Sequence, residues 1–520
     1  MKNKKISIFA LGAALSLFAS NMQSSSTNTK PGENYVFAAY NWLKNMTSTP
    51  SQRAYEEKLN TLLTAHQQGY PPAQETYQKL NSQKPFVTSI GISMSQTEDT
   101  NNTIHPEYLK TLLAEQSQKQ NNPQQWLKER HGYVVRSEQE YRPFTTEDKK
   151  NMVEQLHKLG VFKQKGAQGL PAYRLSIELA DIVDNNGNTD NNKLQEQAEF
   201  LSELGNPLTF MHHYTNPQCK PRLFESREDI TWFADKCVDV VRACPGLTHV
   251  CPISQIMGFG LQVARQEMLP PFSCDIKPKK QISFLDKLSN FDFTDAKATE
   301  FLENIVEAQI TAGLKIKNTR PNIKVLISHQ WKPMKTKHSF GNLRQPIEKC
   351  VANIADNMCN QKFVAMVKAK DPKLQSFDGI ALSVYPSLYF EDWKPDGNNC
   401  SGKLDPEAAL EAIVQTAQAF PGKDIYIVET GCNLDNKTEI ADKQKFVDMT
   451  LYVCQLAQEM GIPVKTCYFW GQNNDQYFEW NKVKDRKNSS KNDKAQFGPF
   501  DTMDPESMNP YGEYLKKVIS

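Results

Sequence analysis

The sequence predicts an α/β protein built as one (β/α)8 TIM barrel with a short helical N-terminal extension. Between residues 84 and 520, short apolar runs rich in β-branched and aromatic residues alternate eight times with longer segments of helical period. This alternation is typical of parallel sheets covered by helices, and it fits a barrel or a doubly wound open sheet. Polar residues follow directly after the apolar runs, at the strand ends where barrel enzymes carry their active sites. Their position favours the barrel.

Residues 1–20 have the features of a secretory signal peptide. Three lysines precede an apolar run from Ile6 to Ala19, which is shorter than the ~20 apolar residues that a membrane-spanning helix needs. No later apolar run is long enough to cross a bilayer. We therefore expect a secreted or periplasmic protein with no membrane attachment beyond this signal.

Residues 21–83 are predicted to form a tether and the helical extension. The stretch 21–33 is rich in Ser, Thr and Asn, and a helix is predicted over 52–66 because apolar residues there recur at helical spacing. The apolar face of this helix consists of Tyr55, Leu59, Leu62 and Leu63. The segment is too small for a core of its own, so we expect it to pack on the barrel of residues 84–520.

The eight predicted strands are short runs bounded by polar residues. They cover 86–92, 172–178, 207–213, 247–253, 323–329, 378–384, 424–429 and 464–470. The pattern Ser/Thr-x-x-Asp, which can cap a helix start reciprocally, begins at Thr145 and at Ser226 and predicts helices over 146–160 and 227–243. Long polar stretches over 99–144, 262–295 and 481–496 are predicted to be surface loops.

Composition excludes some classes of function. The chain has 61 basic and 59 acidic residues and a formal net charge of +2, without a basic stripe, so we expect no nucleic-acid partner. Eleven cysteines are an odd number, so at least one is free or pairs with another chain. No Cys-x-x-Cys motif occurs, and we expect no metal ion and no cofactor. Three cysteines within apolar runs are predicted to be buried: Cys251, Cys454 and Cys467.

Several polar residues at the predicted strand ends are candidates for a site, and each has a plainer alternative. A glutamate that ends a strand, such as Glu429, more often accepts loop hydrogen bonds than attacks a substrate. His212 and His213 suggest metal binding, but no further ligand lies at suitable spacing. Arg174 can be a structural ion-pair partner. Tryptophans such as Trp470 are usually core residues.

Several segments that follow one another in order carry a resemblance to a known family. They are FVTSIGISMSQTE (86–98), YRLSI (173–177), LTFMHHYTNPQ (208–218), LTHVCPISQI (247–256), YIVETG (426–431) and YFWGQNNDQYFEW (468–480). Together they resemble the successive signatures of family 1 glycoside hydrolases, the β-glucosidase family. The resemblance covers nearly the whole chain after residue 85.

The resemblance implies roles for individual residues. Glu429 matches the nucleophilic carboxylate, and Arg174 and Tyr385 match the groups that hydrogen-bond the nucleophile and keep it ionised. Other positions match those that bind the sugar hydroxyls or stack on its faces. These positions are Gln96, His213, Trp470, Glu479 and Trp480.

The chain departs from the family pattern on the fourth strand. Ser254 and Gln255 stand where the family has an Asn that binds the sugar 2-hydroxyl and a Glu that acts as acid/base. An amide cannot exchange a proton at ordinary pH, and the loss of general acid catalysis typically lowers a rate by about 10²- to 10⁴-fold. The plant myrosinases also carry Gln here, and their thioglucoside leaving group needs no protonation. Glu178, where the family usually has Ser, is a candidate for a displaced acid/base or for a simple ion pair.

Two functions remain open from the sequence. The first is retaining hydrolysis, or transfer, of O- or S-linked β-glycosides through a covalent intermediate on Glu429. The second is binding of carbohydrate by a pseudoenzyme that keeps the pocket without the chemistry. Retention of Glu429 with Arg174 and Tyr385 favours the first, whereas Gln255 favours the second. The sequence does not define the sugar or the oligomeric state.

Overall fold

The computed structural model describes eleven ranges of the 520-residue chain. They are 50–91, 145–164, 169–184, 186–212, 223–257, 296–336, 345–391, 394–395, 404–431, 440–472 and 498–520. The predicted signal peptide at 1–20 and the predicted loops over 99–144, 262–295 and 481–496 lie outside these ranges.

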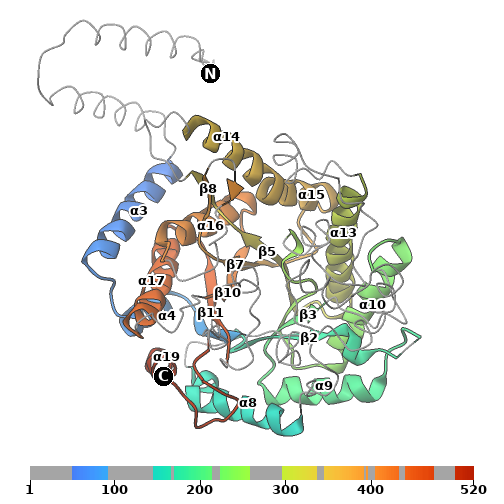
Figure 1. Ribbon diagram of the computed structural model, residues 1–520. Helices are drawn as coiled ribbons and strands as arrows, with labels where there is room; N and C mark the ends of the chain where they lie inside the picture. The colour runs from blue at the N-terminus through green and yellow to red at the C-terminus, as the bar shows by residue number, and fades with distance from the viewer. Residues whose placement is uncertain are drawn as a thin grey trace, which may run out of the picture. The chain divides into compact units, whose positions relative to one another are not determined.

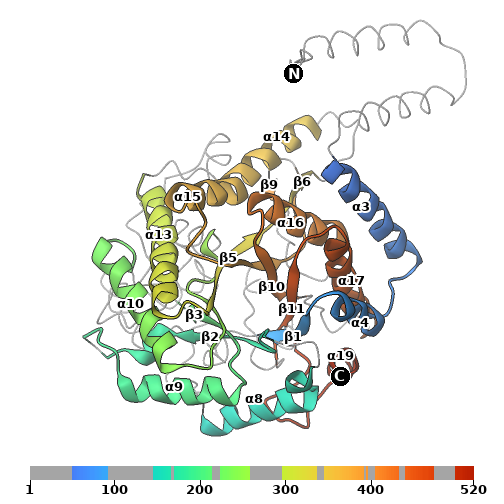
Figure 2. The same cartoon turned by 180° about the vertical axis from the view of Figure 1, so that it is seen from behind.

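Eight parallel strands close into a barrel, in the order β1-β11-β10-β7-β5-β4-β3-β2 (Figures 1 and 2). The strands are β1 (Val87–Gly91), β2 (Arg174–Glu178), β3 (Leu208–His212), β4 (His249–Cys251), β5 (Lys324–Trp331), β7 (Gly379–Val384), β10 (Asp424–Thr430) and β11 (Val464–Trp470). Each overlaps one predicted strand, and the closed sheet excludes the doubly wound alternative. The predicted (β/α)8 barrel is confirmed.

Helices surround the barrel, as Figure 1 shows in a view along the barrel axis. They are α8 (Thr146–Leu159), α9 (Asn191–Glu203), α10 (Arg227–Ala243), α13 (Ala296–Thr319), α14 (Gln345–Asp356), α15 (Lys362–Lys370), α16 (Pro406–Ala419), α17 (Ile440–Glu459) and α19 (Pro510–Ile519). Short η2 (Val161–Lys163), η3 (Leu179–Ile182) and η4 (Asn357–Gln361) segments adjoin them. The capping boxes at Thr145 and Ser226 form as predicted.

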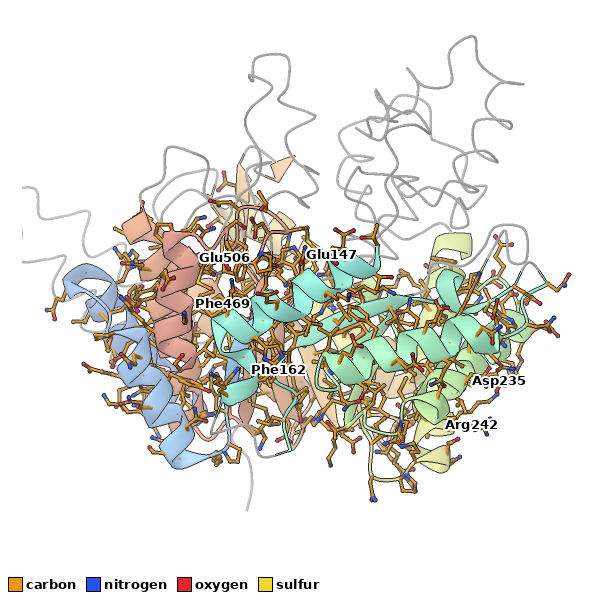
Figure 3. The ribbon with its side chains drawn as sticks, turned by 90° about the horizontal axis from the view of Figure 1, so that it is seen from below. Glu147, Phe162, Asp235, Arg242, Phe469 and Glu506 are labelled. Carbon is orange, nitrogen blue, oxygen red and sulfur yellow. The ribbon has the colours of Figure 1, made fainter. Side chains whose placement is uncertain are left out.

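Helix α10 illustrates why these segments pack as a ring. Ile230, Phe233 and Cys237 are buried on its inner face, whereas Asp235 and Arg242 lie on the outer surface of the ring (Figure 3). The apolar side chains recur at helical spacing, so one stripe of the helix covers the sheet and the other remains in water. Burial of this stripe removes the outer face of the strands from solvent.

Two helices precede the barrel strands: α3 (Pro50–Gln68) and α4 (Ala73–Gln83). The chain divides into compact units of residues 1–58 and 59–520. Within the second unit, the amide of Ala73 at the start of α4 donates to Asp448 of α17 over 2.7 Å, so α4 joins the outer ring. The predicted division into a signal peptide, an extension ending at residue 83 and a barrel stays a prediction.

The interior of the barrel is filled by inward side chains from neighbouring strands. The cluster consists of Val87, Leu208, Phe210, Cys251, Leu326, Ala381, Tyr426, Val428 and Tyr468. Because successive side chains of a strand alternate between its two faces, these residues define which positions of each strand point inward. The predicted burial of Cys251, Cys454 and Cys467 is confirmed, and all three are free thiols.

The strands are staggered, as barrel closure requires. Gly91, the last residue of β1, pairs with Arg174, the first residue of β2, and with Trp470, the last residue of β11. The stagger therefore brings Arg174 to the level at which β1 and β11 end. Its side chain faces the carboxyl-terminal mouth of the barrel although it begins its own strand.

A small second sheet, β6-β8-β9, follows the ends of β5 and β7. Its strands are β6 (Met334–Thr336), β8 (Leu388–Glu391) and β9 (Lys394–Pro395). Lys335 of β6 forms ion pairs with Glu407 at 3.1 Å and Glu411 at 3.6 Å on α16. Within the described ranges, no helix is long and apolar enough to span a membrane, and no three potential metal ligands gather.

Candidate active site

Glu429 lies near the end of β10 and points into the barrel mouth because the strand is irregular there. Tyr426 and Val428 belong to the inward cluster, so strict alternation would direct Glu429 outward, towards the helices. The pairing of β10 with both β7 and β11 shifts register after Ile427. Such a bulge inserts one residue and re-aims the side chain that follows it. Only 8% of Glu429 is exposed.

Both oxygens of the Glu429 carboxylate accept hydrogen bonds. The Tyr385 hydroxyl donates to Oε1 over 2.5 Å, and Gln255 Nε2 donates to Oε2 over 3.0 Å. Tyr385 directly follows β7, and Gln255 follows β4. The ends of three strands therefore bring together three of the residues that the sequence predicts for one site.

Burial raises the pKa of the Glu429 carboxyl above its ordinary value of 4.5, because a buried carboxylate loses its hydration. The charge of Arg174, the hydrogen bonds from Tyr385 and Gln255, and the charge of Lys332 all act in the opposite direction. Arg174 and Tyr385, the two groups expected to keep this carboxyl ionised, both favour its charged form. Their effect is smaller than that of burial.

Arg174 is buried to 99% and contacts two aromatic rings. Its guanidinium carbon lies 4.3 Å from the ring centre of Phe210 and 4.9 Å from that of Trp470. In the described part of the chain, it acts on Glu429 through its charge, whereas the hydrogen bonds to that carboxylate come from Tyr385 and Gln255. Gly91 leaves the space that this arginine occupies, because a Cβ there would lie 2.9 Å from the Arg174 Cβ.

Gln255 is held in a conformation that is unusual for a non-glycine residue, with φ at +45°. Its backbone N–H donates to Ser328 Oγ of β5 over 2.9 Å, and its side-chain Nε2 also donates to Ser383 Oγ of β7 over 3.2 Å. Both serines are buried. The amide group thus has both of its N–H bonds engaged and faces Glu429 in a fixed orientation.

The remaining predicted site residues divide into two groups. Trp470 is 7% exposed and contacts Arg174, and Ser254 is half-buried beside Gln255. Four sugar-binding candidates lie outside the described residues: Gln96, His213, Glu479 and Trp480. Glu178 ends β2, but its side chain is also outside the described part of the structure.

Three residues near the site were not singled out from the sequence: Ser328, Ser383 and Lys332. Ser328 and Ser383 lie inside predicted strands, and Lys332 directly follows the observed strand β5. Alternation along each strand would have placed the two serines on the inward face. It would not have shown which residues of the neighbouring strands lie beside them. Their relation to Gln255 depends on register across β4, β5 and β7.

The site described so far offers a carboxylate that can attack a substrate, but among the described residues no second carboxyl is hydrogen-bonded to it. A buried carboxylate is held by a phenol and an amide beside a guanidinium, so it can attack an electrophilic carbon. Of the described residues, those that hydrogen-bond Glu429 are Tyr385 and Gln255, neither of which is a second carboxyl. Retaining glycosidases pair a nucleophilic carboxylate with a second carboxyl that donates a proton.

Comparison with known proteins relates the fold to that of β-glycosidases. No protein-family model matches the chain, and no curated protein matches it in sequence. A β-glycosidase of the hyperthermophile Thermosphaera aggregans superposes with a TM-score of 0.57 and 12% identity over 84% of this chain and 96% of that one. A family 1 β-glucosidase of Thermotoga maritima gives a TM-score of 0.51 and 13% identity, covering 84% and 97%.

A rice β-glucosidase is similar to the same extent. A Glu-to-Gln mutant of that enzyme, solved in a covalent complex with glucose, superposes with a TM-score of 0.55 and 13% identity over 84% of this chain and 98% of the rice chain. Identities this low establish the fold and leave the activity open. The chain has the (β/α)8 fold of solved β-glycosidases and carries Glu429, Tyr385 and Gln255 together at the mouth of its barrel.

Proposed function

We propose that the protein is a retaining β-glycosidase that hydrolyses O- or S-linked β-glycosides, or transfers their sugar, through a covalent intermediate on Glu429. The observation that carries this proposal is the hydrogen-bonded burial of the Glu429 carboxylate at the barrel mouth. Barrel enzymes carry catalysis at this end, and a buried carboxylate with a raised pKa is typical of a functional site. The reaction needs no cofactor.

Gln255 determines which glycosides can react. In the resemblance to family 1 glycoside hydrolases, Gln255 matches the position of the general acid, yet an amide cannot protonate the leaving oxygen. Substrates whose leaving group departs without protonation should therefore be cleaved, such as thioglycosides and glycosides of acidic phenols. The rice mutant supports this reasoning in part, since it holds glucose covalently after one Glu was replaced by Gln.

Carbohydrate binding without turnover is the second candidate. It is favoured by one contact, the 3.0 Å hydrogen bond from Gln255 to Glu429 Oε2. An attacking carboxylate needs a lone pair directed at the substrate carbon, and this hydrogen bond occupies one oxygen. A pseudoenzyme would retain the bond when sugar binds, whereas an enzyme would exchange it for the substrate.

The two candidates differ in turnover of activated substrates. 2,4-Dinitrophenyl β-glycosides of several sugars should be hydrolysed, and azide should accelerate the reaction, because a small anion attacks the intermediate without a general base. Sugar binding is measured in parallel by calorimetry. Binding without turnover, with or without azide, would favour the pseudoenzyme and contradict the enzyme.

The proposed setting of the reaction is outside the cytoplasm. The charged and apolar N-terminus of residues 1–20 supports export to the periplasm or the medium. The proposed partner is a carbohydrate substrate, and the balanced charge of the chain gives no support for nucleic acid. Western blotting of the medium and of periplasmic and cytoplasmic fractions tests the export directly.

A further inference from the structure

Strand β5 directs a row of polar side chains into the barrel, and only part of this row belongs to the candidate active site. Ser328 faces Gln255, since its hydroxyl accepts the Gln255 backbone N–H. The next residue, His329, faces the opposite way, stacking on Phe363 of α15 with ring centres 4.3 Å apart. Trp331 also faces the helices, because its indole N–H donates to Gln415 of α16 over 2.7 Å. Alternation therefore directs positions 330 and 332 inward, on the side of Ser328.

Lys332 lies at the rim between two residues of the site. In the barrel order, β5 lies between β4, which leads to Gln255, and β7, which leads to Tyr385. Trp331 pairs with Val384 in the β5–β7 register, so Lys332 comes level with Tyr385. Its carbonyl accepts a 3.0 Å hydrogen bond from Asn360 Nδ2, which fixes the backbone at this point.

Within the described ranges, the ammonium group of Lys332 forms no ion pair. The residue is half-buried, and its Nζ takes part in none of the hydrogen bonds or ion pairs of the described ranges. Lys335, three residues later, pairs with Glu407 and Glu411. Lys332 is close enough to favour the ionised form of Glu429 through its charge. A partly dehydrated cation without a carboxylate partner is suited to an anion supplied by a ligand.

We propose that Lys332 is a catalytic residue that stabilises the leaving group of the glycoside as it departs in its anionic form. This inference rests on the proposed function and extends it to the leaving group. Because β5 adjoins the Gln255 strand, Lys332 lies on the side from which a retaining enzyme assists departure. A positive charge there substitutes electrostatically for the missing proton donor.

The step balances without a proton. A Glu429 oxygen forms a bond to the anomeric carbon while the bond from that carbon to the leaving oxygen or sulfur breaks. The electron pair of the broken bond remains on the leaving group, which separates as a phenolate, enolate or thiolate beside Lys332. Water then cleaves the glycosyl ester, regenerating the carboxylate and releasing a proton to solvent. The expected substrates are glycosides whose aglycone departs as a stable anion.

The test measures how the rate depends on the acidity of the leaving group. The value of kcat/KM is determined for aryl β-glycosides of phenols with graded pKa, using the wild-type protein and Lys332→Met. The variant should lose about 10²-fold with the least acidic phenol and much less with 2,4-dinitrophenol, so its Brønsted plot becomes steeper. Lys332→Arg retains the charge and should restore most of the wild-type slope.

Lys324→Met is the matched control, because it removes the same charge from the exposed start of the same strand. Its Brønsted slope should equal that of the wild type. A Brønsted slope that is unchanged in Lys332→Met, or a loss of kcat/KM that is the same for all phenols, overturns the proposed role of Lys332. Either result leaves the proposed function standing. No turnover of any glycoside by the wild-type protein overturns both.

Discussion

Gln255 donates its side-chain amide to Glu429, with 3.0 Å between Nε2 and Oε2. The same nitrogen donates to Ser383, so the amide cannot rotate without losing two hydrogen bonds. A retaining glycosidase needs two carboxyl groups about 5 Å apart at this point. Under the proposed function, Gln255 stands in for the second carboxyl: it has nearly the same shape but cannot exchange a proton.

Gln255→Glu should restore a proton donor. Two carboxyls in contact cannot both ionise easily, so one stays protonated near neutral pH and can act as the acid. We expect activity on poorly activated β-glycosides to rise about 10²-fold or more, and a basic limb to appear in the pH profile of kcat/KM. Steady-state kinetics on alkyl and aryl glycosides measures both. An unchanged rate and profile would show that proton donation does not limit the reaction.

Tyr385→Phe should move the acid limb of the reaction to higher pH. The hydroxyl stabilises the charged form of Glu429, and its loss raises the pKa of this carboxyl further above 4.5. The rate of covalent inactivation by a 2-fluoro glycoside is followed between pH 4 and 9. A limb at the wild-type position would contradict the role given to Tyr385. Thermal unfolding of the variant separates this effect from misfolding.

Glu429→Gln should change how stability depends on pH. The folded-state pKa of Glu429 is raised above its ordinary value of 4.5, so ionisation costs stability, which falls as pH rises from 4.5 through the folded-state pKa. The variant should therefore gain stability relative to the wild type over this window, with no pH-dependent difference below it. Urea unfolding at a series of pH values measures the difference. A difference that is flat with pH would contradict the burial effect.

Ser328→Ala should destabilise the turn that carries Gln255. The Gln255 backbone N–H would lose its acceptor at a residue whose φ is already strained, which costs about 1–3 kcal/mol. Ser89→Ala is the matched control, because the buried Ser89 hydroxyl has no hydrogen-bond partner among the residues that the structure describes. Denaturant unfolding compares the two free energies. Equal stability of both variants would mean that Ser328 does not support Gln255.

Gly91→Ala should disturb Arg174 from the neighbouring strand. The added Cβ would lie 2.9 Å from the Arg174 Cβ and 3.0 Å from its Cδ, so the arginine must shift. We expect a loss of about 1–3 kcal/mol of stability and a higher pKa for Glu429, seen in the pH profile of inactivation. Gly379→Ala, which crowds Tyr426 at the opposite barrel end, should lower stability without moving that profile.

The strands were predictable because each is an apolar run buried on both faces, and local hydrophobicity suffices to find such runs. The orientation of Glu429, by contrast, was not predictable from the sequence. Tyr426 and Val428 point inward, so the simple alternation visible in the sequence directs Glu429 to the helices. The bulge after Ile427 reverses this direction, and it is a property of pairing with two neighbouring strands.

The partners of Gln255 were hidden from the sequence for a similar reason. Ser328 and Ser383 are common residues in ordinary strands, and their meaning depends on which strands lie side by side. Lys332 is one of many lysines in the chain until strand order places it between the ends of β4 and β7. Motifs predicted Glu429, Tyr385 and Gln255, whereas three-dimensional register was needed for the residues that hold them.

The most direct test is mass spectrometry of the protein after incubation with a 2,4-dinitrophenyl 2-deoxy-2-fluoro-β-glycoside. The fluorine slows breakdown of a glycosyl-enzyme, and the activated phenolate departs without an acid, so Gln255 does not prevent labelling. The account predicts one sugar adduct per chain, located by peptide digestion on Glu429 and absent from Glu429→Gln. An adduct on another residue, or no adduct with any sugar that binds, would contradict it.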